Sequence, residues 1–392
     1  MHINSDSPVA HFGLLVNTGS RDEEEHQHGI AHFIEHVIFK GTKKRRAYHI
    51  LSRLDDVGGD LNAYTTKEET AFYASFLSTH YERTIELISD IVFNSVFPEN
   101  ELAKEREVII DEINSYKDSP SELIFDDFEE MIYAGHPIGR NILGTQSSIK
   151  SFGRAEIEDF MLNNYHTDQM VLCSVGNIQF SKLKRYSEKY FGPVPENARS
   201  GKRRAFTAYK PVSKLMNLNT HQVHSILGNV AYNARNKKRL SLVLLNNLLG
   251  GQGLNSRLNL SLREKYGYAY NVESSFTPYF DTGVMSIYFG TDRDKYEKSL
   301  KLVHRELNKL CTNKLGTLQL KRAKDQMTGQ IAISAENKEN LLFTLGKSYL
   351  LFDKFEDLPE VYRQINSITA NQLLDVANET LNPDQLSLLT YI

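Results

Sequence analysis

The residue types in this chain that most clearly point to chemistry are two histidines and a glutamate in the segment His32-Phe33-Ile34-Glu35-His36. On a helix, His32 and His36 lie four residues apart and share one face, and Glu35 borders that face. Two imidazoles in this arrangement can bind a divalent cation, which lowers the pKa of a bound water that the carboxylate can deprotonate. We therefore expect His32 and His36 to bind one zinc ion, with Glu35 as the general base.

The surroundings of these three residues support a metal site. Apart from Gly29, all other residues of the segment 29–39 are apolar, and a helix that is apolar all round is normally buried. Burying three ionisable side chains together without partners costs free energy, and a bound cation removes that cost. The alternative is that both histidines are core residues with the carboxylate as hydrogen-bond partner, because the pattern H-x-x-E-H also occurs by chance.

A zinc ion in a hydrolase site usually has three protein ligands and a water, so a third ligand is needed. The expected helix at 99–117 supplies candidates on the stripe that should face the core. Read in steps of three and four residues, that stripe consists of Leu102, Glu105, Ile109, Glu112 and Tyr116. Inward carboxylates need a cation or strong hydrogen bonds, so one glutamate can bind the metal while the other orients a histidine. The alternative is an ion pair with a basic residue such as Lys104 or Arg106, and the spacing does not decide between the two.

Hydrophobic periodicity predicts the elements that position these residues. We expect strands at 9–17, 60–64 and 70–77, and helices at 29–39, 47–57, 79–94 and 99–117. The second half of the chain offers a strand at 223–232, a helix at 237–249 and further Tyr-rich alternating strands. Because this order matches that of the first half, the two halves look like distant copies of one domain.

The best linker candidate is the segment 193–212, which contains three prolines and a basic cluster at 202–204. We expect these basic side chains to be solvated. The domains are then an N-terminal zinc-binding catalytic domain at 1–197, a linker at 198–212 and a homologous domain at 213–392.

Composition sets limits on function. The formal net charge of −3 gives no reason to expect nucleic acid or an anionic membrane as a partner. The two cysteines, Cys173 and Cys311, lie far apart and are best interpreted as reduced thiols. Without a signal peptide or an apolar stretch of spanning length, the sequence predicts a soluble, cytoplasmic protein.

Six segments together resemble the pitrilysin/insulinase family of zinc metallopeptidases, whose inverted zinc motif is H-x-x-E-H. The likeness is greatest to bacterial processing-peptidase-like proteins and the mitochondrial processing peptidase β subunit, and it covers nearly the whole chain. The segments are GSRDE at 19–23, GIAHFIEHVIFKGT at 29–42, VGGDLNAYTTKEETAFY at 57–73, EREVIIDEI at 105–113, HPIGRNILGT at 136–145 and SRLNLSLREKYGYAY at 256–270.

The resemblance implies a role for each candidate residue. Glu112 matches the family's third zinc ligand, Glu105 its supporting acidic residue and Glu35 its general base. Arg263 and Tyr270 match an Arg–Tyr pair in the second domain that holds the substrate carbonyl and stabilises the oxyanion. The alternatives are a surface ion pair of Arg263 with Glu264 or another acid, and a core aromatic at Tyr270.

The segment GGDLNAYT at 58–65 is similar to the family's substrate-binding edge strand. A peptide would add to that edge through main-chain hydrogen bonds, with Asn62 and Ala63 as the candidate contacts. The alternative is an internal hairpin without a free edge.

The resemblance also implies an architecture and partners. We expect an α+β fold of two homologous domains, each a mostly antiparallel sheet with helices packed on one face. The chain begins within or just after a short strand that usually opens the first domain, which puts the N-terminal pairing of that sheet in doubt. Larger relatives join four such domains, so this chain should form a homodimer or pair with an inactive homologue.

The expected function is a zinc-dependent endopeptidase that cleaves short or unfolded peptides. The alternatives are a non-catalytic family member that binds peptides or supports assembly, and a metal-dependent hydrolase of other substrates. Three further features carry no functional expectation. His26 and His28 lie in an acidic, polar run and should be solvated loop residues. His136 belongs to a turn, and the glycine-rich segment 248–253 lacks the Gly-Lys-Ser/Thr ending of a phosphate loop.

Overall fold

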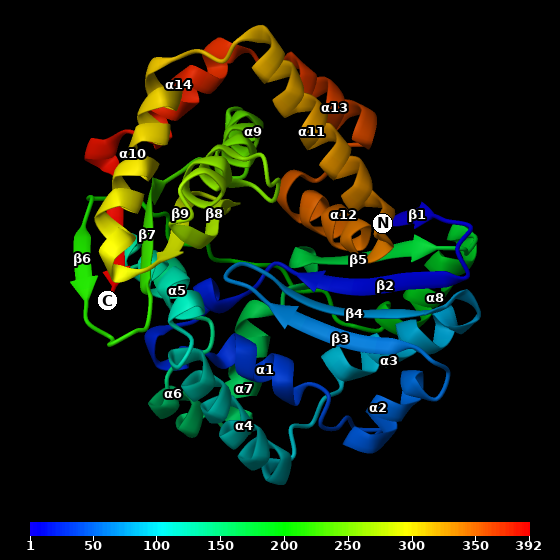
Figure 1. The fold of residues 1–392 in the computed structure, drawn as a ribbon. Coiled ribbons are helices and arrows are strands. Elements are labelled where there is room, and N and C mark those ends of the chain that lie inside the picture. The colour runs from blue at the N-terminus through cyan, green and yellow to red at the C-terminus, as the bar shows by residue number, and fades with distance from the viewer. The chain divides into compact units, whose positions relative to one another are not determined.

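The computed structural model describes residues 1–392, which form two compact units (Figure 1). Unit 1 contains residues 1–115, 140–203 and 334–355, and unit 2 contains 116–139, 204–333 and 356–392. Each unit is therefore assembled from three separate stretches of the chain.

Each unit is built on one five-stranded sheet. In unit 1 the strand order is β1 (His2–Asn4), β5 (Met170–Gly176), β2 (Val9–Val16), β4 (Thr70–Leu77) and β3 (Asp60–Thr65). In unit 2 it is β6 (Ser213–Met216), β10 (Ser387–Tyr391), β7 (Val223–Val230), β9 (Gly283–Thr291) and β8 (Ala269–Pro278). In both sheets only the first pair, β1 with β5 and β6 with β10, is parallel. The matching order confirms the predicted fold of two homologous, mostly antiparallel domains.

The helices complete the two units. Those of unit 1 are α1 (Ile30–Val37), α2 (Ala47–Asp55), α3 (Tyr81–Phe93), nearly all of α4 (Glu99–Lys117), α6 (Gln146–Ser151), α7 (Arg154–Asn164), α8 (Phe180–Phe191) and α12 (Lys338–Phe352). Those of unit 2 are α5 (Pro120–Ile132), α9 (Arg239–Gly250), α10 (Tyr296–Thr312), most of α11 (Thr317–Glu336), α13 (Leu358–Ser367) and α14 (Ala370–Thr380). A single π-helical segment, η6 (Asn259–Lys265), precedes β8. No helix has the length and apolarity that crossing a membrane would require.

The predicted elements of the first half are present with small differences at their ends. The expected strand at 9–17 is β2, and the expected helix at 99–117 is α4. Alternation explains β2, because Phe12 and Leu14 enter the main core of unit 1 while Leu15 joins a second cluster on the opposite face. The short strand β1 supplies the N-terminal pairing that was in doubt, beside β5.

Both faces of the unit 1 sheet are covered. The helices α1 and α3 lie on one face, and α12 lies on the other, against β2 and β5 (Figure 1). Gly346 allows α12 to approach closely, because a Cβ atom there would lie 2.5 Å from Leu15 Cδ2. The predicted one-sided packing therefore describes the helices of the first half, and a helix from the second half adds another layer.

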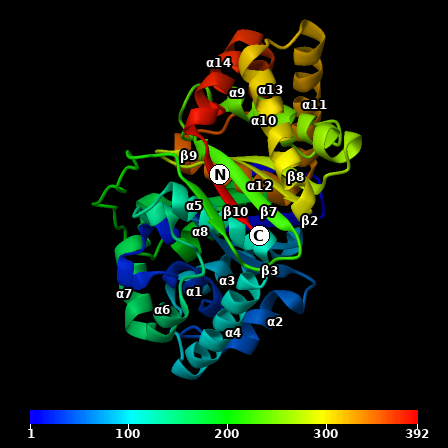
Figure 2. The same ribbon diagram turned by 60° about the vertical axis from the view of Figure 1, so that its left-hand side comes forward.

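Unit 2 receives a helix in the same way. The helix α5, which belongs to the first half of the sequence, packs against β7 and β10 (Figure 2). Its residues Ile124 and Phe128 share a core cluster with Ile226 and Leu389. The predicted domains at 1–197 and 213–392 thus differ from the compact units, since α5 and α12 are exchanged. The physical reason is that β2 and β7 have apolar residues on each face, Leu14 and Leu15 in β2 and Ile226 and Leu227 in β7, so each sheet needs a second covering helix.

Candidate metal centre

The helices α1 and α4 bring the zinc-motif histidines and a glutamate together. One ligand atom from each of His32, His36 and Glu112 lies within 4.8 Å of the others. His32 Nε2 is 3.7 Å and His36 Nε2 is 3.5 Å from Glu112 Oε2. Tetrahedral zinc with bonds of about 2.0–2.2 Å holds neighbouring ligand atoms roughly 3.3–3.5 Å apart. The two distances to Glu112 are close to this spacing, so the three donors suit one zinc ion.

A second carboxylate supports this group from behind. Glu105 Oε2 is 3.3 Å from His36 Nδ1, and Glu105 Oε1 is 2.7 Å from Lys40 Nζ. A carboxylate on one ring nitrogen fixes the tautomer, so that the other nitrogen faces the metal. The basic neighbours Lys104 and Arg106 pair instead with Glu101 and Glu99. Glu105 thus contacts His36 and forms its ion pair with Lys40, while its supporting role at a metal stays a prediction.

Two of the three residues, His32 and Glu112, are in the protonation state that binds a metal. Burial lowers the pKa of His32 to about 4, so its imidazole is neutral near pH 7. The hydrogen bond from His36 lowers the pKa of Glu112, which keeps it ionised. Burial lowers the pKa of His36 as well, but Glu112 and Glu105 outweigh it and the net shift is upward. Without a metal, His36 therefore keeps its proton to a higher pH than a free imidazole, and a bound cation would replace that proton beside the same carboxylates.

The two histidines are held differently. His36 Nδ1 faces Glu105, whereas His32 Nδ1 is buried without a hydrogen-bond partner. The orientation of His32 therefore depends on the packing and position of α1 itself.

Glu35 lies on α1 beside the histidines, as expected of a general base. Burial raises the pKa of its carboxyl group, and hydrogen bonding from Thr65 and the charge of His36 oppose that rise. A raised carboxyl pKa suits a group that takes up a proton and passes it on near neutral pH. Thr65 is the last residue of β3, so this strand contacts the base directly.

The strand β3 is at the edge of the unit 1 sheet, with β4 on one side and no strand of the sheet on the other. This excludes the internal-hairpin alternative for that sheet. Asn62 is exposed and donates a 2.7 Å hydrogen bond to Asp60, while Ala63 packs partly against the core. Their contact with a peptide remains a prediction.

Arg263 and Tyr270 belong to unit 2. Arg263 lies in η6 with its Nε 3.7 Å from Glu264 Oε1, so the predicted alternative of a surface ion pair is present. Tyr270, near the start of β8, is 78% exposed, and the alternative of a core aromatic is wrong. The roles of both residues in the active site stay predictions.

Two histidines outside the zinc motif, His28 and His136, make polar contacts with the main chain of other segments. His28 is not a solvated loop residue, because its Nε2 lies 2.8 Å from the Asn141 carbonyl oxygen. His136 is buried in unit 2, 3.0 Å from the Arg204 carbonyl oxygen, and is not part of the metal group. His26 is exposed, as expected.

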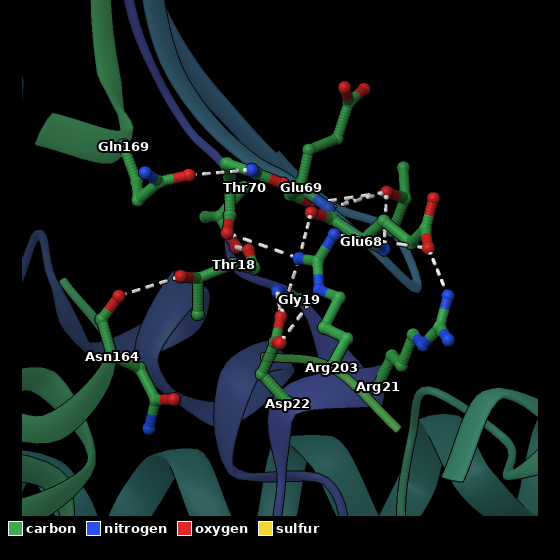
Figure 3. A network of polar contacts seen from close by, with 12 residues as sticks. Thr18, Gly19, Arg21, Asp22, Glu68, Glu69, Thr70, Asn164, Gln169 and Arg203 are labelled. Atoms are coloured by element: carbon green, nitrogen blue, oxygen red, sulfur yellow. Dashed lines mark hydrogen bonds and ion pairs between the residues drawn. The ribbon is translucent and has the colours of Figure 1, made fainter. Parts of the chain in front are cut away.

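The prediction of solvated linker residues is wrong for Arg203. Its guanidinium is only 9% exposed and donates to Asp22 at 2.7 and 2.8 Å and to the Glu68 carbonyl oxygen at 2.9 Å (Figure 3). Arg21 pairs with the Glu68 carboxylate in the same network. The Asp22 carboxylate supplies the close countercharge that burial of an arginine requires, and the Glu68 carboxylate lies 3.8 Å away. Lys202 is exposed, as expected.

Known proteins resemble the whole chain. A sequence profile described as Insulinase (Peptidase family M16) matches residues 1–146, and one described as Peptidase M16 inactive domain matches residues 151–327. The uncharacterized zinc protease YmxG of Bacillus subtilis is 33% identical over 95% of this chain and 90% of its own length. The chain belongs to peptidase family M16. This confirms the family resemblance seen in the sequence.

Other M16 relatives carry similar names. Uncharacterized zinc proteases of Rickettsia felis and Mycobacterium leprae are 33% and 30% identical, over 94% and 95% of this chain and 89% and 84% of theirs. A crystal structure of a protease from Helicobacter pylori superposes with a TM-score of 0.92 at 21% identity, covering 100% of this chain and 96% of that chain. A structure described as a peptidase M16 inactive domain from Pseudomonas fluorescens gives 0.93 at 21% identity, covering 100% and 94%. These structures support the M16 fold, and the names of the sequence relatives indicate a zinc-dependent peptidase.

The sequence interpretation missed one residue near the metal group. Glu23 is a buried acid at the end of the GSRDE segment, and it contacts the start of α1. The sequence does contain a signal for this residue, because an acidic side chain shortly before an apolar helix can accept hydrogen bonds from the first amides of that helix.

Proposed function

We propose that this protein is a zinc-dependent endopeptidase. The observation that supports it best is the spacing of 3.5 and 3.7 Å between Glu112 Oε2 and the two imidazole nitrogens, with Glu35 on the same helix face. A purely structural histidine pair would not require a third acidic donor at the distance that zinc needs.

The residues divide the chemistry among them. His32, His36 and Glu112 would hold the metal, and Glu105 would orient His36. Bound zinc would acidify water and polarise the carbonyl group of the scissile bond. Glu35 would take a proton from the attacking water and deliver it to the leaving amine nitrogen. Arg263 and Tyr270 would contact the substrate carbonyl oxygen as negative charge develops on it.

The edge strand β3 would bind the substrate. A peptide that adds to β3 near Asn62 and Ala63 makes main-chain hydrogen bonds and lies beside Thr65 and Glu35. Because this mode recognises extended backbone, the substrates would be short or unfolded peptides with loose side-chain preferences.

We also propose that the active species contains two chains, either two copies of this chain or one copy with an inactive homologue. Light scattering combined with peptide cleavage tests this. A fully active monomer would exclude it.

The decisive experiment is cleavage of a mixed peptide library by wild type, by wild type with chelator and by Glu35→Gln. We expect cleavage by the wild type only, while Glu35→Gln retains zinc. Glu107→Gln, an exposed acid on α4, is the matched control and should cleave like wild type. A wild type that cuts nothing, or a Glu35→Gln variant that cuts equally well, would contradict the proposal.

A further inference from the structure

The helix that carries the zinc motif is held at its first turn by a buried acid. Glu23 Oε2 accepts a hydrogen bond from the Gly29 amide at 2.9 Å, and Glu23 Oε1 accepts one from the Ala31 amide at 3.0 Å. The first amides of a helix have no partner within the helix, so side-chain acceptor oxygens at this end satisfy them. Ala31 directly precedes His32, so this cap reaches the backbone of the first zinc-motif histidine.

The same end of α1 is fixed by a loop from residues 140–144. Gly29 has a φ of +95°, and a Cβ atom there would lie 2.7 Å from the Cα atom of Gly144. Arg140 Nη2 donates to the Glu23 carbonyl oxygen at 3.1 Å. The backbone of the capping residue is therefore itself anchored, and the start of the helix has little freedom to shift.

Such a cap matters because α1 has eight residues, and a helix this short is not stable on its own. His32 has no hydrogen-bond partner on Nδ1, so no hydrogen bond at that nitrogen fixes its ring. Metal sites tolerate deviations of only about 0.2 Å in ligand distance. The distance from His32 Nε2 to Glu112 therefore depends on where the first turn of α1 lies.

We propose that Glu23 is a positioning residue for the metal centre, and that its two amide bonds set the first turn of α1 so that His32 meets Glu112. This deepens the proposed function and rests on it for the identity of the metal. The competing explanation is that Glu23 contributes only to folding stability, as any buried carboxylate would.

The test compares three full-length variants. Glu23→Ala removes both acceptor oxygens, and Glu23→Gln keeps one. Asp90→Asn changes another buried carboxylate of unit 1, which pairs with Arg45 and accepts from Thr42 and makes no bond to α1. Zinc affinity is measured by competition with a chromophoric chelator, and the melting temperature is measured on metal-free protein.

We expect Glu23→Ala to weaken zinc binding about 10–100-fold, the range typical of residues that orient metal ligands. Glu23→Gln should lose less. Asp90→Asn should keep wild-type zinc affinity even where its melting temperature falls as far as that of a Glu23 variant. If Glu23→Ala does not fold, the comparison of Glu23→Gln with Asp90→Asn decides.

The proposal is overturned if folded Glu23 variants bind zinc as tightly as wild type, or if Asp90→Asn loses as much affinity at an equal loss of melting temperature. Because zinc affinity is the readout, the outcome does not depend on peptide cleavage. A wild type that binds zinc but cuts no peptide would count against the endopeptidase. The zinc affinities of the Glu23 variants would still decide the role of Glu23.

Discussion

Two helix pairs occupy corresponding places in the repeated domain and differ in chemistry. In unit 1, α1 and α4 meet through His36 and Glu112, whose Nε2 and Oε2 atoms are 3.5 Å apart. In unit 2, α9 and α11 meet through Asn247 and Gln330, with a 2.9 Å hydrogen bond from Nδ2 to Oε1. The amide pair satisfies itself and offers no metal ligand set, whereas two imidazoles and a carboxylate can bind a cation. One sheet order thus serves a candidate metal centre in one unit and a neutral contact in the other, so the fold alone does not set function.

The helix compositions explain this contrast. The only ionisable residue of α9 is Arg239 at its first position, and the buried residues of α11 are Ala323 and Met327. The buried stripe of α4 instead contains Glu105, and α1 contains both histidines and Glu35. The buried positions of α9 and α11 thus carry no titratable group, and these helices lie largely within the residues 151–327 that match the inactive-domain profile.

The strongest way to break the contrast is to give unit 1 the side chains of unit 2. The double change His36→Asn with Glu112→Gln should abolish zinc binding and peptide cleavage while the fold persists, because the amides can bond to each other. Metal content and circular dichroism check this. The reverse change, Asn247→His with Gln330→Glu, is the control and should create no zinc site, since Val243 occupies the position four residues earlier. Full zinc content in the first variant would contradict our assignment of the ligands.

A second change separates metal binding from proton transfer. Glu35→Gln should lower the turnover number by about 10²–10⁴-fold, the usual contribution of a general base, while zinc content stays at the wild-type level. Steady-state kinetics and metal analysis on the same sample test this. Loss of zinc together with activity would instead place Glu35 among the ligands.

The boundary between the units lies within the linker, between Arg203 and Arg204. Stability measurements can test whether Arg203 belongs to unit 1. Arg203→Ala removes the close partner of the Asp22 carboxylate and a donor to the Glu68 carbonyl oxygen, while Arg21 still pairs with the Glu68 carboxylate. Removing one partner of a buried ion pair should cost about 3–5 kcal/mol in the free energy of unfolding. Chemical denaturation with a probe in unit 1 measures this. Lys202→Ala, at the exposed neighbouring position, should change stability little. Equal effects of the two changes would show that the arginine is not part of the unit 1 core.

The support behind His36 has no equivalent in the neutral pair of unit 2. Glu105→Ala should weaken zinc binding about 10–100-fold, because His36 loses the carboxylate that fixes its tautomer. Isothermal titration of metal-free protein with zinc measures the change. An unchanged affinity would mean that packing alone orients His36.

The smallest effect concerns pH. The pKa of His36 is raised above its ordinary value of 6.5, because Glu112 and Glu105 outweigh the lowering effect of burial. Zinc must displace this proton, so the zinc affinity should fall as the pH is lowered through the pKa of His36, which lies above 6.5. The fall should be at most about tenfold per pH unit for each proton displaced. Zinc titrations across this range would show a flat profile if His36 were already neutral. The amide contact of unit 2 does not titrate.

Local sequence determined much of this protein. Apolar periodicity placed β2, α1 and α4, and the helical spacing of α4 was enough to put Glu105 and Glu112 on one stripe. Residue chemistry and family likeness together predicted the ligands, the base and the edge strand, and the edge position of β3 is confirmed. These features follow from neighbours a few residues apart, where helix and strand geometry fix which side chains share a face.

Tertiary structure alone decided the rest. Periodicity shows that a face is buried but not which element covers it, so it does not reveal the exchange of α5 and α12 between units. The same holds for Arg203, whose partners lie 181 and 135 residues away, and for Glu23, whose effect depends on the exact start of α1. From the sequence alone, the Arg203 side chain is predicted to be solvated, because the carboxylates that make its burial favourable come from distant parts of the chain.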